Sequence, residues 1–258
     1  METSMFAEER RIKIVDLIEE RQKVTVEELC GTFGVSSATI RTDLQELQSS
    51  GFLTRTHGGA IRKAKTGFEL NSRQKQVQHL VEKQRIAKAA LSLIDNGDRI
   101  ILDTGTTTLE LAKLLHQRKD ITVITNDLII ASVLEEIQDI DVIVIGGVLR
   151  KRFHCTIGIQ GRDTCAGLTV DKAFMGVNSL SLAKGATTPD ISQAETKKMM
   201  VTLANRVILL CDSSKIGKVS FAQFATLDRI DTVVTDAIDD DTRSQFAEHD
   251  VEVVVAGR

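Results

Sequence analysis

Hydrophobic residues recur at helical spacing at the start of the chain and predict two helices there. An apolar stripe from Ile12 to Ile18 indicates a first helix over about residues 7–21. Thr25 and Glu28 then have the spacing of a capping box, in which each residue satisfies a free backbone group at the start of a helix. A short second helix is therefore expected directly after Thr25.

A third helix and a hairpin follow. Gly34 can end the second helix in a left-handed conformation, and either Ser36 or Ser37 can cap the third. The apolar residues of the third helix fall on one face at i, i+4 and i+7. They are Ile40, Leu44 and Leu47. An alternating run then predicts a strand, and the pair Gly58-Gly59 supplies a two-residue hairpin turn. This order of elements is the layout of a winged helix-turn-helix domain.

A polar segment separates this unit from the rest of the chain. We place the winged helix-turn-helix domain at residues 1–62, a linker at residues 63–79 and a larger α/β domain at residues 80–258. After an amphipathic helix that ends at Asn96-Gly97, short runs rich in Val, Ile and Leu alternate with helical stretches. The runs are Arg99–Leu102, Ile121–Ile124, Val142–Ile145, Ala173–Met175, Val207–Leu210, Thr232–Val234 and Val251–Val255. They predict a largely parallel sheet that is covered on both faces.

Composition narrows the class of protein. The 258 residues are 42% hydrophobic and 27% charged, which is the balance of a folded globular protein. No apolar run approaches the length of a membrane-spanning helix, and the acidic N-terminus does not resemble a secretory signal. The four cysteines are far apart, and no pair of histidines has metal-binding spacing. We therefore expect a cytoplasmic protein with no metal site and no cofactor.

Charge is distributed unevenly, and this changes the expected partner. The net charge is −3, but residues 36–65 hold five basic and two acidic residues. The polar face of the third helix carries Ser37, Arg41, Thr42 and Gln45, which suit phosphate and base-edge contacts in a major groove of DNA. The alternative is an ordinary solvated helix face.

The residues of this region also carry a family resemblance. The runs Val35–Leu47 and Gly51–Ala60 closely resemble the N-terminal signature of the DeoR/GlpR family of bacterial transcriptional regulators. The resemblance implies a recognition helix over Ser36–Gln45 and a wing over Arg55–Ala60. The residues expected to contact a double-stranded DNA operator are Ser36, Ser37, Thr39, Arg41, Thr42, Gln45, Arg55 and His57. Thr42 departs from the family, which more often has a basic residue there.

Asp43 is a carboxylate on a helix expected to face DNA. It either orients Arg41 or Arg55 through a charge-assisted hydrogen bond or is an exposed helix charge. Binding to two half-sites requires a homodimer or homotetramer, and the sequence leaves this choice open.

A second set of candidate residues follows the predicted strands. Asp103–Thr108 lies between a strand and a helix, where free backbone N–H groups and hydroxyls can bind an anion. Simple helix capping is the alternative. Polar residues also follow other strands, among them Thr125-Asn126, Gly146-Gly147 and Asp212–Gly217, and ligands of open α/β sheets bind at such strand ends. Lys215 can act as a point charge for a phosphate, or it is an exposed loop lysine.

These segments, with Asp171–Gly176 and Glu195–Met199, resemble the sensor domain of the same family. That domain shares a superfamily with ribose-5-phosphate isomerase, glucosamine-6-phosphate deaminase and CoA transferases. The resemblance implies a phosphorylated sugar or related metabolite as effector. The residues expected to bind it are Asp103, Gly105, Thr106, Thr107, Thr108, Asn126, Gly146, Gly147, Glu195, Lys198 and Lys215.

The function expected from these observations is repression of a carbohydrate-metabolism operon, with operator affinity controlled by the effector. A sugar-phosphate isomerase or deaminase with an extra domain is the enzymatic alternative, but no catalytic motif of those enzymes is present. In a third alternative, the larger domain only oligomerises. Whether the effector induces or co-represses is left open.

Overall fold

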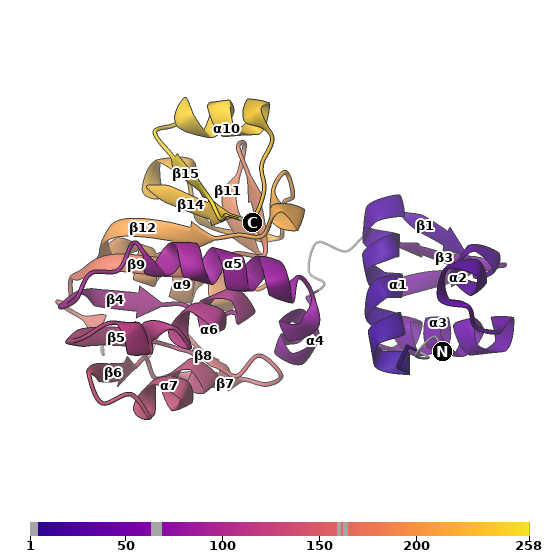
Figure 1. Ribbon diagram of the computed structural model, residues 1–258, viewed down its shortest axis with the longest axis horizontal. Coiled ribbons are helices and arrows are strands. Elements are labelled where there is room, and N and C mark those ends of the chain that lie inside the picture. The colour runs from indigo at the N-terminus through magenta and orange to yellow at the C-terminus, as the bar shows by residue number, and fades with distance from the viewer. Residues whose placement is uncertain (1–4, 63–68, 159–160, 162–164, 258) are drawn as a thin grey trace. The chain divides into compact units, whose positions relative to one another are not determined.

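The computed structural model describes residues 5–62, 69–158, 161 and 165–257 (Figure 1). The chain forms two compact units, Met1–Phe68 and Glu69–Arg258. Of the linker expected at residues 63–79, residues 63–68 lie outside the described residues, and the remainder belongs to the second unit. Ser72 fixes this remainder because its N–H and hydroxyl donate to the carbonyls of Arg152 and Phe153, at 3.1 and 3.2 Å.

Three helices and a small antiparallel sheet build the first unit. The helices are α1 (Ala7–Arg21), α2 (Val26–Phe33) and α3 (Ser37–Ser49). The strands, in sheet order, are β1 (Lys23–Thr25), β3 (Gly59–Arg62) and β2 (Leu53–Thr56). The predicted helices are confirmed, and so is the capping box of Thr25 and Glu28. Gly34 ends α2 with φ 64°, as expected.

The turn of the wing differs from the prediction by one residue. The turn consists of His57 and Gly58, and Gly59 is already the first residue of β3. Gly59 pairs with Thr56 on one side and with Thr25 of β1 on the other. A Cβ atom at Gly59 would lie 2.1 Å from the carbonyl oxygen of Val24, so the close approach of β1 requires glycine here. Strand β1 was not expected from the sequence.

Asp43 corrects an expectation for α3. It is 1% exposed, so it is neither an exposed helix charge nor a partner of Arg41 or Arg55. Its two carboxylate oxygens accept from Nε of Arg10 at 2.7 Å and Nε of Arg11 at 2.9 Å. Positions 40, 43, 44 and 47 share one face of a helix, so Asp43 lies among the buried residues of α3 and ties it to α1.

Seven parallel strands form the main sheet within the described part of the second unit. In sheet order they are β15 (Glu252–Val255), β14 (Thr232–Thr235), β12 (Ala204–Leu210), β9 (Val170–Gly176), β4 (Arg99–Leu102), β5 (Ile121–Thr125) and β6 (Ile140–Val144). Each of the seven apolar runs contributes one of these strands, so the prediction of a parallel α/β sheet is confirmed.

Alternate residues of the strands face two separate cores, because successive side chains of a strand point to opposite faces. Ile100 and Leu102 pack with α5 (Leu80–Leu91), α6 (Thr106–Ala112) and α7 (Leu128–Glu135), which cover the face nearer the viewer in Figure 1. Ile101 packs on the other face with α9 (Ile191–Leu203) and α10 (Asp240–Ala247). Both faces are therefore covered, as expected.

Several smaller elements were not predicted. Strands β10 (Ser179–Ser181), β11 (Gly185–Thr188) and β13 (Ala222–Ala225) form an antiparallel sheet, and β7 (Val148–Arg150) pairs with β8 (Cys155–Ile157). Helix α4 (Ser72–Val77) lies in the expected linker. The short 3-10 helices are η1 (Leu115–Gln117), η2 (Ser213–Lys215) and η3 (Leu227–Arg229). In the described parts of the chain, no helix is long and apolar enough to cross a lipid bilayer.

We expect Asp43→Asn to destabilise the first unit by about 3 kcal/mol, because the substitution leaves the buried guanidinium of Arg10 without its counter-charge. Hydrogen exchange of α1 and α3 amides in the full chain at increasing urea concentrations measures the change. Glu46→Gln is the control, since Glu46 pairs with Arg11 from an exposed position. It should cost less than about 1 kcal/mol. Equal losses in the two variants would contradict the assigned role of Asp43.

Candidate functional site

Helix α3 presents the expected recognition surface in the first unit. Ile40, Leu44 and Leu47 are buried, whereas the residues expected to contact DNA are exposed, apart from half-buried Thr39. Ser36 is the N-cap, and its side chain accepts from the N–H of Thr39 at 3.2 Å. The start of α3 is thus held in shape by a residue that also lies on the exposed surface.

The wing is attached to the same helix by two glutamines. Gln48 accepts from the backbone N–H of Arg55 at 2.9 Å, and Gln45 accepts from its guanidinium at 3.4 Å. His57 lies exposed in the turn of the wing. Arg55 is therefore carried beside α3, and the exposed residues of helix and wing belong to one surface.

In the second unit, Asp103 marks the carboxyl edge of the parallel sheet. It follows β4 and is fully buried. Its Oδ2 atom accepts from the N–H of Gly176 at 2.9 Å and pairs with the ammonium of Lys197, while Oδ1 has no hydrogen-bond partner within the described residues. Burial raises the pKa of Asp103, and the neighbouring Lys197 opposes that rise. Among the described residues, one oxygen of this buried carboxylate thus has no hydrogen-bond partner.

The residues after β5 hold the loop after β4. Asn126 accepts from the N–H of Thr104 at 3.2 Å and donates to the carbonyl of Thr156 at 2.9 Å. Asp127 accepts from the hydroxyl of Thr104 at 2.6 Å and also caps α7. The amide of Asn126 is therefore already engaged in fixing two loops.

The loop between β4 and α6 is tightly packed. Thr107 and Thr108 are buried, and the hydroxyl of Thr108 donates to the carbonyl of Gly105 at 2.9 Å. Thr106 is half-buried, and Gly105 is the N-cap of α6 without a side-chain cap. The alternative to anion binding was helix capping by a threonine side chain. The N-cap of α6 is Gly105, and no side chain caps it.

Four further predicted residues lie in two exposed settings. Gly146 and Gly147 are exposed, and a Cβ atom on Gly147 would lie 2.5 Å from the carbonyl oxygen of Ile157. Glu195 and Lys198 pair with each other at 3.0 Å on the exposed face of α9. It is Lys197, not Lys198, that reaches Asp103. Glu195 and Lys198 are therefore not part of the buried cluster around Asp103.

Lys215 is anchored at the end of β12. Its ammonium pairs at 3.0 Å with Asp212, whose side chain is 2% exposed. Burial would raise the pKa of Asp212, but Lys215 and the hydroxyl of Ser214 hold it well below the usual range. Lys215 is partly buried, so the reading of a freely exposed loop lysine is not what the structure shows.

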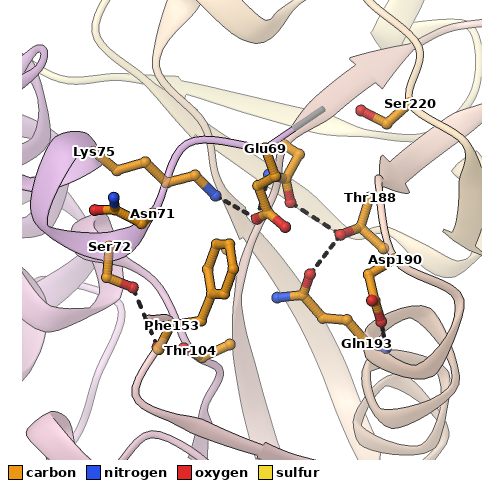
Figure 2. A network of polar contacts seen from close by, with 12 residues as sticks. Glu69, Asn71, Ser72, Lys75, Thr104, Phe153, Thr188, Asp190, Gln193 and Ser220 are labelled. Carbon is orange, nitrogen blue, oxygen red and sulfur yellow. Dashed lines mark hydrogen bonds and ion pairs between the residues drawn. The ribbon is translucent and has the colours of Figure 1, made fainter. Parts of the chain in front are cut away.

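Sequence reasoning missed the segment that leads into the second unit. Glu69 pairs with Lys75 at 2.5 Å and with Arg150 at 2.7 Å, and Asn178 donates to it at 3.0 Å. Figure 2 shows the ammonium of Lys75 directed at this carboxylate, close to the ring of Phe153. The segment expected to be a linker therefore supplies charged side chains to the second unit.

Four lysines influence one another here. Burial lowers the pKa of Lys75, and the charges of Lys215 and Lys197 lower it further, against the opposing effect of Glu69. Burial, with the nearby Lys215, lowers the pKa of Lys83 to about 8. The ammonium of Lys83 donates to the carbonyls of Lys75 and Gln78 and, among the described residues, forms no ion pair.

A signal for two of the missed lysines exists in the sequence. Lys83 precedes Ile86, Ala87 and Ala90 on the buried face of α5, at i+3, i+4 and i+7. Lys197 likewise precedes the buried residues Met200 and Val201 of α9, at i+3 and i+4. A lysine on an apolar helix face is rarely buried without a partner, so this position indicates a functional or paired charge. No comparable pattern marks Glu69 or Arg150.

Comparison with known proteins identifies both units. Residues 10–66 match the DeoR-like helix-turn-helix domain, and residues 78–237 match the DeoR C terminal sensor domain. A ribose 5-phosphate isomerase of Methanocaldococcus jannaschii is similar in structure with a TM-score of 0.41, at 19% identity over 54% of this chain and 55% of that chain. A likeness of this size says nothing about ligand or reaction.

Relatives match over almost the full length. The chain is 38% identical to the HTH-type transcriptional regulator GlpR of Haloferax volcanii, over 97% of this chain and 98% of the relative. It is 35% identical to the HTH-type transcriptional regulator GolR of Listeria innocua, over 90% and 91%. It is 36% identical to the HTH-type transcriptional repressor GlcR of Bacillus subtilis, over 91% and 90%. This chain therefore belongs to the DeoR family, which is a family of transcriptional regulators and not one of sugar-phosphate isomerases or deaminases.

Proposed function

We propose that this regulator represses genes of carbohydrate metabolism and that a phosphorylated sugar controls its affinity for operator DNA. The observation that carries the proposal is a group of wholly or partly buried lysines, Lys75, Lys83 and Lys215, in the same unit as the buried pair of Lys197 and Asp103. The name of the relative GlcR as a repressor supports the direction of regulation. Because the target is genomic DNA, we place its action in the cytoplasm.

The DNA-binding residues are those exposed on α3 and the wing. A recognition helix enters the major groove with its N-terminal residues at the base edges, which suits Ser37, Arg41 and Gln45. Arg55 and His57 on the wing reach the phosphate backbone or minor groove. The full predicted set also includes Ser36, Thr39 and Thr42. Two such helices are needed for two half-sites, so we propose a homodimer or homotetramer.

The effector site combines two chemistries that a phosphorylated sugar needs. Lys215, with Lys75 and Lys83 beside it, supplies positive charge for a phosphate. Oδ1 of Asp103 can accept a hydrogen bond from a sugar hydroxyl. The other proposed contacts are Gly105, Thr106, Thr107, Thr108, Asn126, Gly146 and Gly147. Contact of Glu195 and Lys198 with the effector stays a prediction, and their exposed side chains, which pair with each other, do not support it.

Lys215→Ala should weaken the response to the effector and leave DNA affinity unchanged, because Lys215 lies in the second unit. The measurement is the melting temperature of the protein with a panel of phosphorylated sugars, using free sugars and inorganic phosphate for comparison. A ligand at a hundredfold excess over Kd stabilises the native state by about 2.7 kcal/mol. We expect one phosphorylated sugar to raise the melting temperature of the wild type and to have little effect on the variant. A panel without any selective shift would contradict a phosphorylated-sugar effector.

Arg41→Ala should weaken DNA binding while leaving the response to the effector intact. With duplex DNA of random sequence, log Kd should rise steeply with log salt, since phosphate contacts release counterions. Loss of one phosphate contact should lower the salt slope by about 1. Arg243→Ala is the control, because it removes the same charge from an exposed position on α10. The proposed surface of α3 would be wrong if both variants bound DNA alike.

Anion affinity should fall as the pH rises through about 8, because Lys83 loses its proton there and only its charged form attracts an anion. Sulfate is a suitable probe, since its charge is constant over this range. We expect titration calorimetry to show several-fold weaker binding at about pH 9 than at about pH 7. In Lys83→Met, binding should be weaker at neutral pH and less dependent on pH. An identical pH profile in the variant would exclude Lys83 from the site.

A further inference from the structure

The carboxylate of Glu69 is an anion supplied by the chain itself. Its side chain is 5% exposed, and it is the first residue of the second unit, next to the segment that leads to the DNA-binding unit. Arg150 and Lys75 each donate to a different oxygen of the carboxylate, and the amide of Asn178 donates to the same oxygen as Lys75. Both oxygens are therefore bound by cations from elsewhere in the unit.

The surroundings keep this carboxylate charged. Burial would raise the pKa of Glu69, but Lys75 and Arg150 outweigh burial and lower it to about 2. The guanidinium of Arg150 is also held in place, because it stacks 3.7 Å from the centre of the Phe153 ring. Lys75, Arg150 and Asn178 thus form a preformed set of donors around a negative charge.

The same donors suit a phosphate. An ammonium, a guanidinium and an amide N–H are the groups that bind phosphate oxygens in proteins, and a guanidinium matches carboxylate and phosphate equally well. The set also lies within the electrostatic reach of Lys215, which belongs to the proposed effector site, and of Lys197, which pairs with Asp103. A ligand phosphate that bound these donors would need the positions that the Glu69 oxygens now hold.

We propose that Lys75, Arg150 and Asn178 form the subsite for the anionic group of the effector and that Glu69 is its built-in competitor. The inference rests on the proposed function. When the anion binds, Glu69 leaves the donors, and the start of the second unit loses its attachment. Because the chain to the DNA-binding unit enters at this residue, occupation of the subsite reaches that unit through the backbone.

The test is the affinity of Glu69→Gln for inorganic phosphate, measured by titration calorimetry on the full chain. If Glu69 occupies the subsite in nine of ten molecules, the apparent Kd is about tenfold weaker than the intrinsic value. Removing its charge should therefore strengthen phosphate binding by about tenfold. Glu252→Gln is the matched control, since it removes a carboxylate that pairs with Arg206 at 2.7 Å on the amino edge of the sheet. It should bind phosphate as the wild type does.

The outcomes separate the inference from the proposed function. Tighter binding in Glu69→Gln alone supports competition. Phosphate binding by the wild type, with no gain in Glu69→Gln, overturns competition and leaves the anion sensor in place. Absence of phosphate binding in both proteins overturns the subsite, whereas the proposed function fails only if the melting-temperature panel shows no selective shift with a phosphorylated sugar.

A measurement on the wild type covers the case in which Glu69→Gln does not fold. Hydrogen exchange over residues 69–75 reports the attachment of this segment, because the N–H of Ser72 donates to the carbonyl of Arg152 and that of Lys75 to the carbonyl of Asn71. Saturating phosphate should speed exchange at Ser72, while amides of the distant α10 stay unchanged. Slower or unaltered exchange at Ser72 would overturn the competition.

Discussion

Asp103 and Lys197 form an ion pair that is almost completely removed from water, where β4, β9 and α9 meet. Removing a charge from water is costly unless partners satisfy it, so the pair constrains everything around it. The N–H of Gly176 binds one carboxylate oxygen, and the carbonyl of Gly176 accepts from Lys197. The end of β9, the loop before α6 and the buried face of α9 are thereby held together. The proposed effector site is built around this arrangement.

The same constraint explains which features could be predicted from the sequence. Hydrophobic periodicity is set by residues that are close together in the sequence. It correctly predicted the seven parallel strands and the helices of the first unit. Polar residues have to be partnered, and their partners are far away in sequence. Asp43 was misplaced because its partners lie on α1, 32 and 33 residues away. Glu69 was assigned to a linker because Arg150 is 81 residues away.

Short strands were missed for a related reason. Strand β1 has three residues, and only pairing with β3 after the chain has returned from the wing makes it a strand. Strands β10, β11 and β13 are no shorter than some predicted strands, but they consist mainly of Ser, Gly, Ala, Thr and Gln and lack the run of Val, Ile or Leu that marks the strands of the main sheet. The turn at His57-Gly58 was shifted because two adjacent glycines fit a hairpin turn equally well in sequence. The approach of Val24 to Gly59 distinguishes them, and it exists only in the folded unit.

In the proposed competition, exchange of one anion for another at the same cations couples effector binding to the release of Glu69. Lys75 and Arg150 are partly buried, and loss of Glu69 would leave Arg150 with only the longer pair to Asp190 at 3.6 Å among the described residues, so an unreplaced Glu69 would destabilise the unit. Glu69 satisfies them when no ligand is present, and a phosphate satisfies them when it binds. The binding free energy is therefore reduced by the interaction that the ligand replaces. By linkage, whatever favours the attached state of Glu69 disfavours the ligand to the same extent. In the proposed competition, DNA binding by the first unit influences the ligand through this attachment, because Glu69 is the first residue of the second unit.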